Sequence, residues 1–95
     1  MVEIRKTEVF AKWIDGLKDV RAHARILVRI ERLAAGNPGD AKPVGEGVSE
    51  LRIDYGPGYR VYYTHRGRSV IILAGGEKRT QDKDIRTALR LAENL

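Results

Sequence analysis

Cysteine is absent from the chain, and histidine occurs only twice. Disulfide bonds and thiolate metal sites are therefore excluded, which fits a protein of a reducing cytoplasm. His23 and His65 stand alone, without neighbours at metal-ligand spacing, so we expect no metal. The sequence also lacks a Walker motif, a nucleophile elbow and a dinucleotide fingerprint, so we expect no cofactor.

Long apolar segments are missing too. No run approaches the roughly 20 residues that span a bilayer, and the opening MVEIRKTEVF lacks the apolar core of a signal peptide. We expect a soluble cytoplasmic protein with no membrane contact. The 95 residues suffice for one domain, residues 1–95, near the lower end of sizes that fold without disulfides or metals.

Positive charge is in excess and evenly spread. Lys and Arg number 18 against 13 Asp and Glu, a net charge of +5. Residues 1–47 carry nine basic and seven acidic side chains, and residues 48–95 carry nine and six. The excess favours a polyanion such as RNA, or an acidic protein, although many small domains are basic for no specific reason. Since there is no basic tail, folding must assemble any binding surface.

The N-terminal part predicts two helices. Residues 2–5 read as a short strand, Thr7 as the cap of a first helix, and Asp19 as the cap of a second helix that runs to about Ala35. Gly36 suits the helix stop. A connection this short predicts an antiparallel helix hairpin. The apolar stripes that repeat at helical spacing are Val9, Phe10, Trp13, Ile14 and Leu17, then Ile26, Leu27, Ile30, Leu33 and Ala34.

A segment rich in glycine and proline, GNPGDAKPVGEG from Gly36 to Gly47, reads as a linker inside the one domain. Strand signals follow it at Leu51–Tyr55, Tyr59–Thr64 and Val70–Ala74, and turns separate them. These runs predict an antiparallel meander. The glycine pair Gly75-Gly76 would end the last strand, and a final helix would follow.

The strand register depends on the length of the first turn. A turn of three residues pairs Asp54 with Arg60 and Arg52 with Tyr62, and sets Tyr62 near Ile72. One face is then apolar and receives the helix hairpin. Its members are Leu51, Ile53, Tyr55, Val61, Tyr63, Ile71 and Leu73. The other face displays Glu50, Arg52, Asp54, Arg60 and Tyr62, with Glu77, Lys78 and Arg79 beside it.

The polar face is the strongest candidate site. Arginine binds phosphate through a planar fork of donors, and strands hold side chains rigidly. The alternative is surface decoration, with Asp54 and Arg60 in an ion pair worth well under about 1 kcal/mol. Two further features stay open. The glycine pair before Lys78 either lets the backbone approach a ligand or forms a turn. The stripe of Arg21, Arg25, Arg29 and Arg32 is either solvated or docks RNA or an acidic partner.

Four motifs together resemble the RelE/ParE toxin superfamily, most closely its HigB-like branch of addiction-module killer proteins. They are Glu50-Leu51-Arg52-Ile53, Gly56-Pro57-Gly58-Tyr59-Arg60-Val61-Tyr62-Tyr63, Leu73-Ala74-Gly75-Gly76-Glu77-Lys78 and Gln81-Asp82-Lys83-Asp84-Ile85. The resemblance covers almost the whole chain. It implies an α+β fold of the RelE type, in which the N-terminal helix hairpin packs on a twisted antiparallel sheet, with a C-terminal helix.

The resemblance also implies a function. RNase members of the superfamily are toxins of type II toxin–antitoxin systems that cleave mRNA, usually on the ribosome, without a metal. The implied partners are mRNA, the ribosome and a cognate antitoxin, often with a helix-turn-helix domain, that forms a hetero-oligomer with the toxin. Other members poison DNA gyrase. The alternatives are therefore a non-enzymatic gyrase inhibitor and a degenerate module that only binds its antitoxin.

The family's functional positions map onto this sequence by motif. The strand arginine corresponds to Arg60, the basic residue of the preceding strand to Arg52, and the basic position after the last strand to Lys78 or Arg79. Several members carry a Tyr or His near the C-terminus, and residues 81–95 contain neither.

The remaining roles are our own inference from the polar face. Tyr62 is the nearest substitute for the missing C-terminal residue, as acid or as base-stacking residue. Glu50 is a candidate general base. Tyr59 and Asp54, together with Arg79, are expected to contact the substrate.

Overall fold

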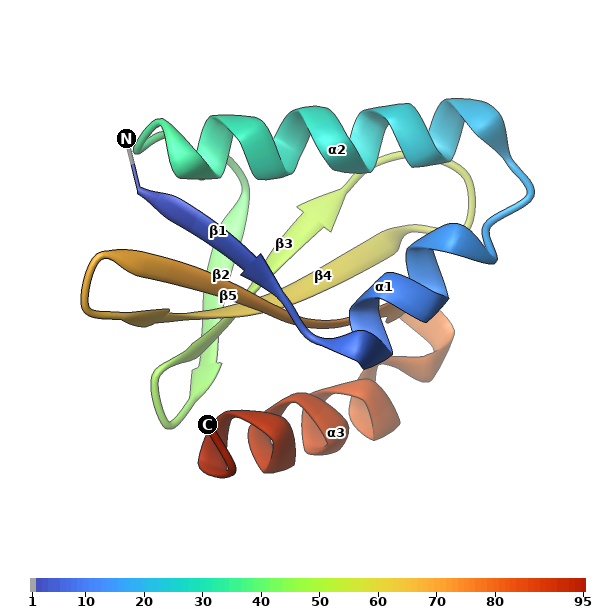
Figure 1. Cartoon of the computed structure of the whole chain (residues 1–95). Helices are drawn as coiled ribbons and strands as arrows, with labels where there is room; N and C mark the ends of the chain where they lie inside the picture. The colour runs from blue at the N-terminus through green and yellow to red at the C-terminus, as the bar shows by residue number, and fades with distance from the viewer. Residues whose placement is uncertain (1) are drawn as a thin grey trace.

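A mixed sheet of five strands forms the centre of the fold and carries helices on both faces (Figure 1). The computed structural model describes residues 2–95, and Met1 of the expected domain lies outside them. The elements are β1 (Glu3–Lys6), α1 (Glu8–Asp15), α2 (Val20–Ala34), β2 (Ala41–Gly45), β3 (Val48–Ile53), β4 (Tyr59–Arg66), β5 (Ser69–Glu77), the 3-10 turn η1 (Lys78–Thr80) and α3 (Gln81–Glu93). The strand order is β1-β5-β4-β3-β2.

Both N-terminal helices begin where their caps predict. The Thr7 hydroxyl accepts a hydrogen bond from the Phe10 N–H at 3.1 Å and donates to the Leu73 carbonyl at 2.6 Å. Asp19 accepts from the N–H groups of Arg21 and Ala22 at 3.0 and 3.1 Å. Side-chain oxygens thus satisfy backbone donors that have no partner within the helix. The bond from Thr7 also anchors the start of α1 to β5.

The sheet differs from the expected meander at both edges. Strands β3, β4 and β5 are antiparallel as predicted, but β1 pairs parallel to β5, with Ile4 opposite Val70. The linker predicted from Gly36 to Gly47 is wrong in part, because it contains β2, which pairs antiparallel with β3. Pro43 argued against a strand in this segment. Proline is nevertheless tolerated on an edge strand, and β2 is at the edge of the sheet.

The register between β3 and β4 is two residues away from the predicted one. Arg52 lies opposite Arg60, and Glu50 lies opposite Tyr62. The predicted pairing of Asp54 with Arg60 is wrong, because the turn uses five residues, 54–58, rather than three. A shift of two residues preserves the side-chain alternation. The residues therefore keep the predicted faces while their neighbours change.

A β-bulge changes the faces of β5. Tyr62 lies opposite Ala74, not near Ile72 as predicted, and Tyr63 lies opposite Ile72, so the register shifts between the two tyrosines. Such a bulge places two residues against one. As a result Ile71 and Leu73 belong to the face covered by α3, and their predicted place under the helix hairpin is wrong.

Two hydrophobic cores lie on opposite faces of the sheet. The first joins α1 and α2 to the sheet through Phe10, Ile14, Ala22, Ile26, Ile30, Leu33, Leu51, Ile53, Tyr59, Val61, Tyr63, Val70 and Ile72. The second joins α3 to the sheet through Val48, Tyr62, Ile71, Leu73, Ala74, Ala88 and Ala92. Helix α3 therefore covers part of the face expected to be polar, whereas the side chains of Arg52 and Arg60 remain partly exposed.

The glycine pair lies inside β5, so the prediction that it ends the strand is wrong. A Cβ atom at Gly75 would collide with the Trp13 indole of α1, and one at Gly76 would collide with the Asp84 carboxylate of α3. The space beside these glycines, predicted either to admit a ligand or to form a turn, is occupied by the protein's own helices, one on each face.

Candidate functional site

Two arginines from neighbouring strands lie directly opposite each other at the open end of the sheet. Like charges in this position repel, and a single carboxylate compensates both. Glu50 Oε1 lies 3.4 Å from Arg52 Nε, and Oε2 lies 4.0 Å from Arg60 Nε. Among residues 2–95 the ion pair of Arg60 is with Glu50, not with Asp54 as predicted.

Glu50 is almost fully buried, with 2% of its surface exposed. The Gln81 side-chain amide, at the start of α3, donates to both of its oxygens at 3.2 and 2.9 Å. Groups from β3, β4 and α3 therefore surround the carboxylate. The role of general base predicted for Glu50 does not fit this position, because a base needs access to the proton that it removes.

The arginines share a cleft with Lys78. The cleft holds about 260 Å³ and is lined by Asp40, Arg52, Ile53, Asp54, Gly58, Arg60 and Lys78. Lys78 reaches it because its backbone N–H donates to the Gly58 carbonyl at 2.8 Å. Gly58 has φ +80°, where a side chain would be strained. The sequence thus correctly grouped Arg52, Arg60 and Lys78, and Asp54 lies with them.

The guanidinium groups keep free donors for a ligand. The Arg60 side chain is 12% exposed and that of Arg52 is 36% exposed. Arg60 Nη1 donates to the Tyr59 and Gly58 carbonyls at 3.3 and 3.5 Å, which fixes the plane of the group. Fixed cations at the base of a cleft can bind a phosphate and stabilise charge that develops on it.

Besides the buried Glu50, three predicted site residues do not line this cleft. Tyr62 has no exposed surface and belongs to the α3 core, so the prediction that it stacks on a base is wrong. Burial, and then the charge of Glu50, raise the pKa of the Tyr62 hydroxyl, which makes it a poor proton donor. Tyr59 faces the other core, 6.1 Å from the Trp13 ring, so it cannot contact a substrate in the cleft. Arg79 is exposed and pairs with Glu77 at 3.1 Å.

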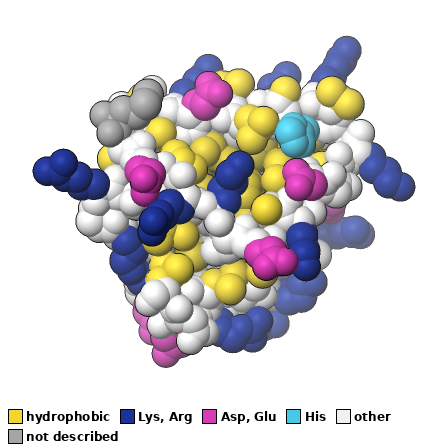
Figure 2. All heavy atoms as spheres, viewed as in Figure 1, with side chains coloured by type: hydrophobic (Ala, Val, Ile, Leu, Met, Phe, Trp, Pro, Cys, Tyr) yellow, Lys and Arg dark blue, Asp and Glu magenta, His cyan; other side chains and the backbone are white. Residues whose placement is uncertain are grey.

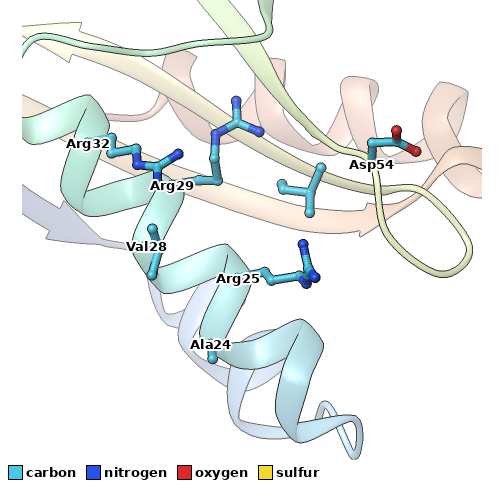
Figure 3. Close-up of a pocket in the computed structure, with 7 residues that line it drawn as sticks. Ala24, Arg25, Val28, Arg29, Arg32 and Asp54 are labelled. Atoms are coloured by element: carbon cyan, nitrogen blue, oxygen red, sulfur yellow. The ribbon is translucent and has the colours of Figure 1, made fainter.

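A second hollow, of about 400 Å³, lies between α2 and β3 (Figure 3). Arg25, Arg29 and Arg32 of the predicted stripe line it. Arg29 donates to the carbonyls of Arg52, Pro38 and Asp40 at 2.6, 3.0 and 3.1 Å. No pattern in the sequence predicts these bonds. They tie α2 to the strand that carries Arg52, and they engage both terminal nitrogens of the half-buried Arg29.

The remaining charges are dispersed. In the view of Figure 2, Lys and Arg side chains are scattered over the visible face and along the outline of the molecule rather than gathered in one block. Within residues 2–95, no group of three His, Asp or Glu side chains could hold a metal ion. In the same range, no helix is both long and apolar enough to cross a membrane. The cleft of Arg52, Arg60 and Lys78 is therefore the best candidate site.

Comparison with known proteins identifies the family of the chain and structures with the same fold. A family model described as phage-derived protein Gp49-like matches residues 12–95. An uncharacterised protein of Haemophilus influenzae strain Rd is 52% identical over 95 residues, covering 99% of this chain and 96% of its own length.

Two solved structures from Helicobacter pylori share the fold. One is the crystal structure of a copper-bound mutant toxin, with 18% identity and a TM-score of 0.61. The other is the solution structure of a conserved hypothetical protein, with 19% identity and a TM-score of 0.56. Each alignment covers 83% of this chain and 97% of the other. The predicted α+β fold of the RelE type is confirmed.

Proposed function

Because the chain belongs to the phage-derived Gp49-like family, a family of RelE-type toxins, we propose that it is the toxin of a type II toxin–antitoxin system and cleaves mRNA on the ribosome. The observation that supports this proposal is the cleft with Arg52 opposite Arg60 and Lys78 at its rim. Rigid arginine forks suit a phosphodiester better than a mobile surface charge would.

The proposed reaction needs no metal. The 2′-hydroxyl of the RNA attacks the adjacent phosphorus and loses its proton, and the bond to the 5′-oxygen breaks. The products are a 2′,3′-cyclic phosphate and a 5′-hydroxyl that has gained a proton. Arg60 binds the phosphate, and Arg52 and Lys78 stabilise the charge that builds on its oxygens. Because Glu50 and Tyr62 are buried, we assign the proton transfers to water, which accepts the proton of the 2′-hydroxyl and supplies one to the 5′-oxygen.

The proposed partners follow from this role. A cognate antitoxin, in the HigB-like branch often a helix-turn-helix protein, would bind the toxin in the cytoplasm and form a hetero-oligomer with it. The net charge of +5 suits an acidic contact segment of that antitoxin.

The test is to express Arg60→Ala without antitoxin and to map transcript ends by primer extension. We expect transcript cutting and toxicity to disappear. Arg68→Ala is the matched control, because Arg68 is an exposed arginine in the turn between β4 and β5. Full cutting by Arg60→Ala would refute the site. DNA damage without cutting by the unmodified protein would favour the gyrase inhibitor, and antitoxin binding without toxicity would favour the degenerate module.

A further inference from the structure

The contacts of Glu50 suggest a function for two residues that touch no substrate. We propose that Glu50 and Gln81 form a positioning pair that fixes Arg52 and Arg60 in the geometry that binds phosphate. This inference rests on the proposed function of the cleft. It adds Gln81, for which the sequence suggested no role, and it replaces the role of general base for Glu50.

The first argument is geometric. One carboxylate oxygen faces Arg52 and the other faces Arg60, and the Gln81 amide donates to both. The Nε atoms of the two arginines are buried and have no hydrogen-bond partner within residues 2–95. Their ion pairs with Glu50 therefore position the two guanidinium groups. The terminal nitrogens of Arg52 and Nη2 of Arg60 stay unengaged in the same range and are left for a ligand.

The second argument is electrostatic. Without Glu50, two positive charges on directly paired residues would repel and turn apart. Glu50 neutralises one of the three cations of the cleft, and Asp40 and Asp54, which also line it, bring the formal sum of charges to zero. Because both aspartates are exposed, water screens their charge, and the arginine donors still face the cleft. That arrangement keeps the arginines together and still attracts a phosphodiester, which carries one negative charge.

The chemistry of Gln81 suits this role. A neutral amide orients the carboxylate without changing the charge of the cluster. A lysine there would compete with the arginines for Glu50, and an acid would repel it. Gln81 and Glu50 are 31 residues apart in the chain, so the pair also joins the first turn of α3 to β3. The position of α3 is thereby linked to the geometry of the arginines.

The test uses Gln81→Ala, Glu50→Gln and the double variant, in mRNA cleavage on programmed ribosomes across a range of pH. We expect each single change to lower the rate about tenfold to a hundredfold, as a displacement of about 1 Å does in other active sites. The double variant should be no slower than the slower single one, because the two residues act as one unit. If Glu50 were the base, Glu50→Gln would abolish the acidic limb of the pH profile, whereas a positioning pair predicts an equal loss at every pH.

Binding of inorganic sulfate separates positioning from simple charge. If Glu50 only weakened the positive field, Glu50→Gln would bind sulfate more tightly and cleave at least as fast as the unmodified protein. The positioning pair predicts slower cleavage even where sulfate binding improves. Lys83→Ala, an exposed change in the same turn of α3, is the control and should alter neither quantity.

Nuclear magnetic resonance of the arginine Nε–H groups tests the pair independently of RNA cleavage. In the unmodified protein the Nε–H signals of Arg52 and Arg60 should exchange slowly with water, since both atoms are buried. Gln81→Ala should speed that exchange while the backbone spectrum stays folded, and it carries the test if Glu50→Gln fails to fold. Unchanged exchange and an unchanged cleavage rate in Gln81→Ala would overturn the inference. Suppose that Nε–H exchange is faster in Gln81→Ala but the unmodified protein does not cleave mRNA. That result would refute the proposed function and leave the positioning pair intact.

Discussion

Replacing Tyr62 with phenylalanine removes one hydroxyl from the second core and separates two accounts of this residue. The hydroxyl has no exposed surface and no hydrogen-bond partner within residues 2–95. Deleting it therefore breaks no bond and removes a buried group that lost its water, which typically costs about 1–3 kcal/mol. We expect Tyr62→Phe to be between equally stable and about 2 kcal/mol more stable than the unmodified protein.

The pH dependence of stability gives a second magnitude for the same change. Burial raises the pKa of Tyr62 above its ordinary value of 10.0, so above pH 10 the unfolded chain loses this proton first. The stabilisation of the folded state by the protonated Tyr62 is complete below pH 10. It is lost as the pH rises toward the pKa that Tyr62 has in the folded protein. One such group lowers the free energy of unfolding by about 1.4 kcal/mol per pH unit. Tyr59 and Tyr63, whose pKa values are also raised, remain in the variant, so the difference isolates Tyr62.

Urea unfolding followed by circular dichroism, at pH 7 and between pH 10 and 12, measures both effects. The stability curve of Tyr62→Phe should fall less steeply above pH 10 than that of the unmodified protein. Its mRNA cleavage should stay within about twofold, whereas loss of a general acid costs about 100-fold to 10,000-fold. If Tyr62→Phe is stable but loses most of its mRNA cleavage, the claim that Tyr62 serves only in the core and not in catalysis is refuted.

Four further predictions concern other parts of the molecule. Gly75→Ala should lower the free energy of unfolding in urea by about 1–3 kcal/mol or more, because the new methyl group collides with Trp13. An equal cost for Gly16→Ala, where the nearest atom is the Lys12 carbonyl oxygen at 3.3 Å, would argue against that cause. Arg29→Ala should cost about 1 kcal/mol in the same assay, mainly through the part-buried bond to the Arg52 carbonyl, since the bonds to Pro38 and Asp40 are exposed to water. Lys78→Ala should weaken sulfate binding, seen by calorimetry, without a change in melting temperature, because its side chain is exposed. Association with the antitoxin, followed by stopped flow, should slow as salt rises, and a rate independent of salt would contradict an electrostatic encounter.

Local signals predicted the N-terminal helices and the faces of β3 and β4 well. The caps Thr7 and Asp19 form the expected hydrogen bonds, because a cap depends only on residues within one turn of it. Alternation along β3 and β4 assigned Arg52 and Arg60 to the same face despite the wrong register, since a shift of two residues leaves alternation unchanged. That is why the main site residues were grouped correctly.

Features that depend on distant parts of the chain were not predicted. The bulge at Tyr62 and the second core under α3 depend on how the sheet packs against the C-terminal helix. Local sequence patterns do not predict that packing. Edge strand β2 was hidden by glycine and by Pro43. Gln81 stood in a recognised motif, but its bond to Glu50 joins residues far apart in sequence. The buried charge network around the arginines is therefore a finding of the structure.

The rate of mRNA cleavage by Arg60→Lys on programmed ribosomes tests the central claim most directly. Lysine keeps the positive charge beside Glu50 and loses the planar fork that binds phosphate. We predict a loss of about a hundredfold or more with little change in melting temperature, in line with removal of one preorganised donor at a transition state. A rate within about twofold of the unmodified protein would contradict the claim that the Arg60 guanidinium binds the scissile phosphate.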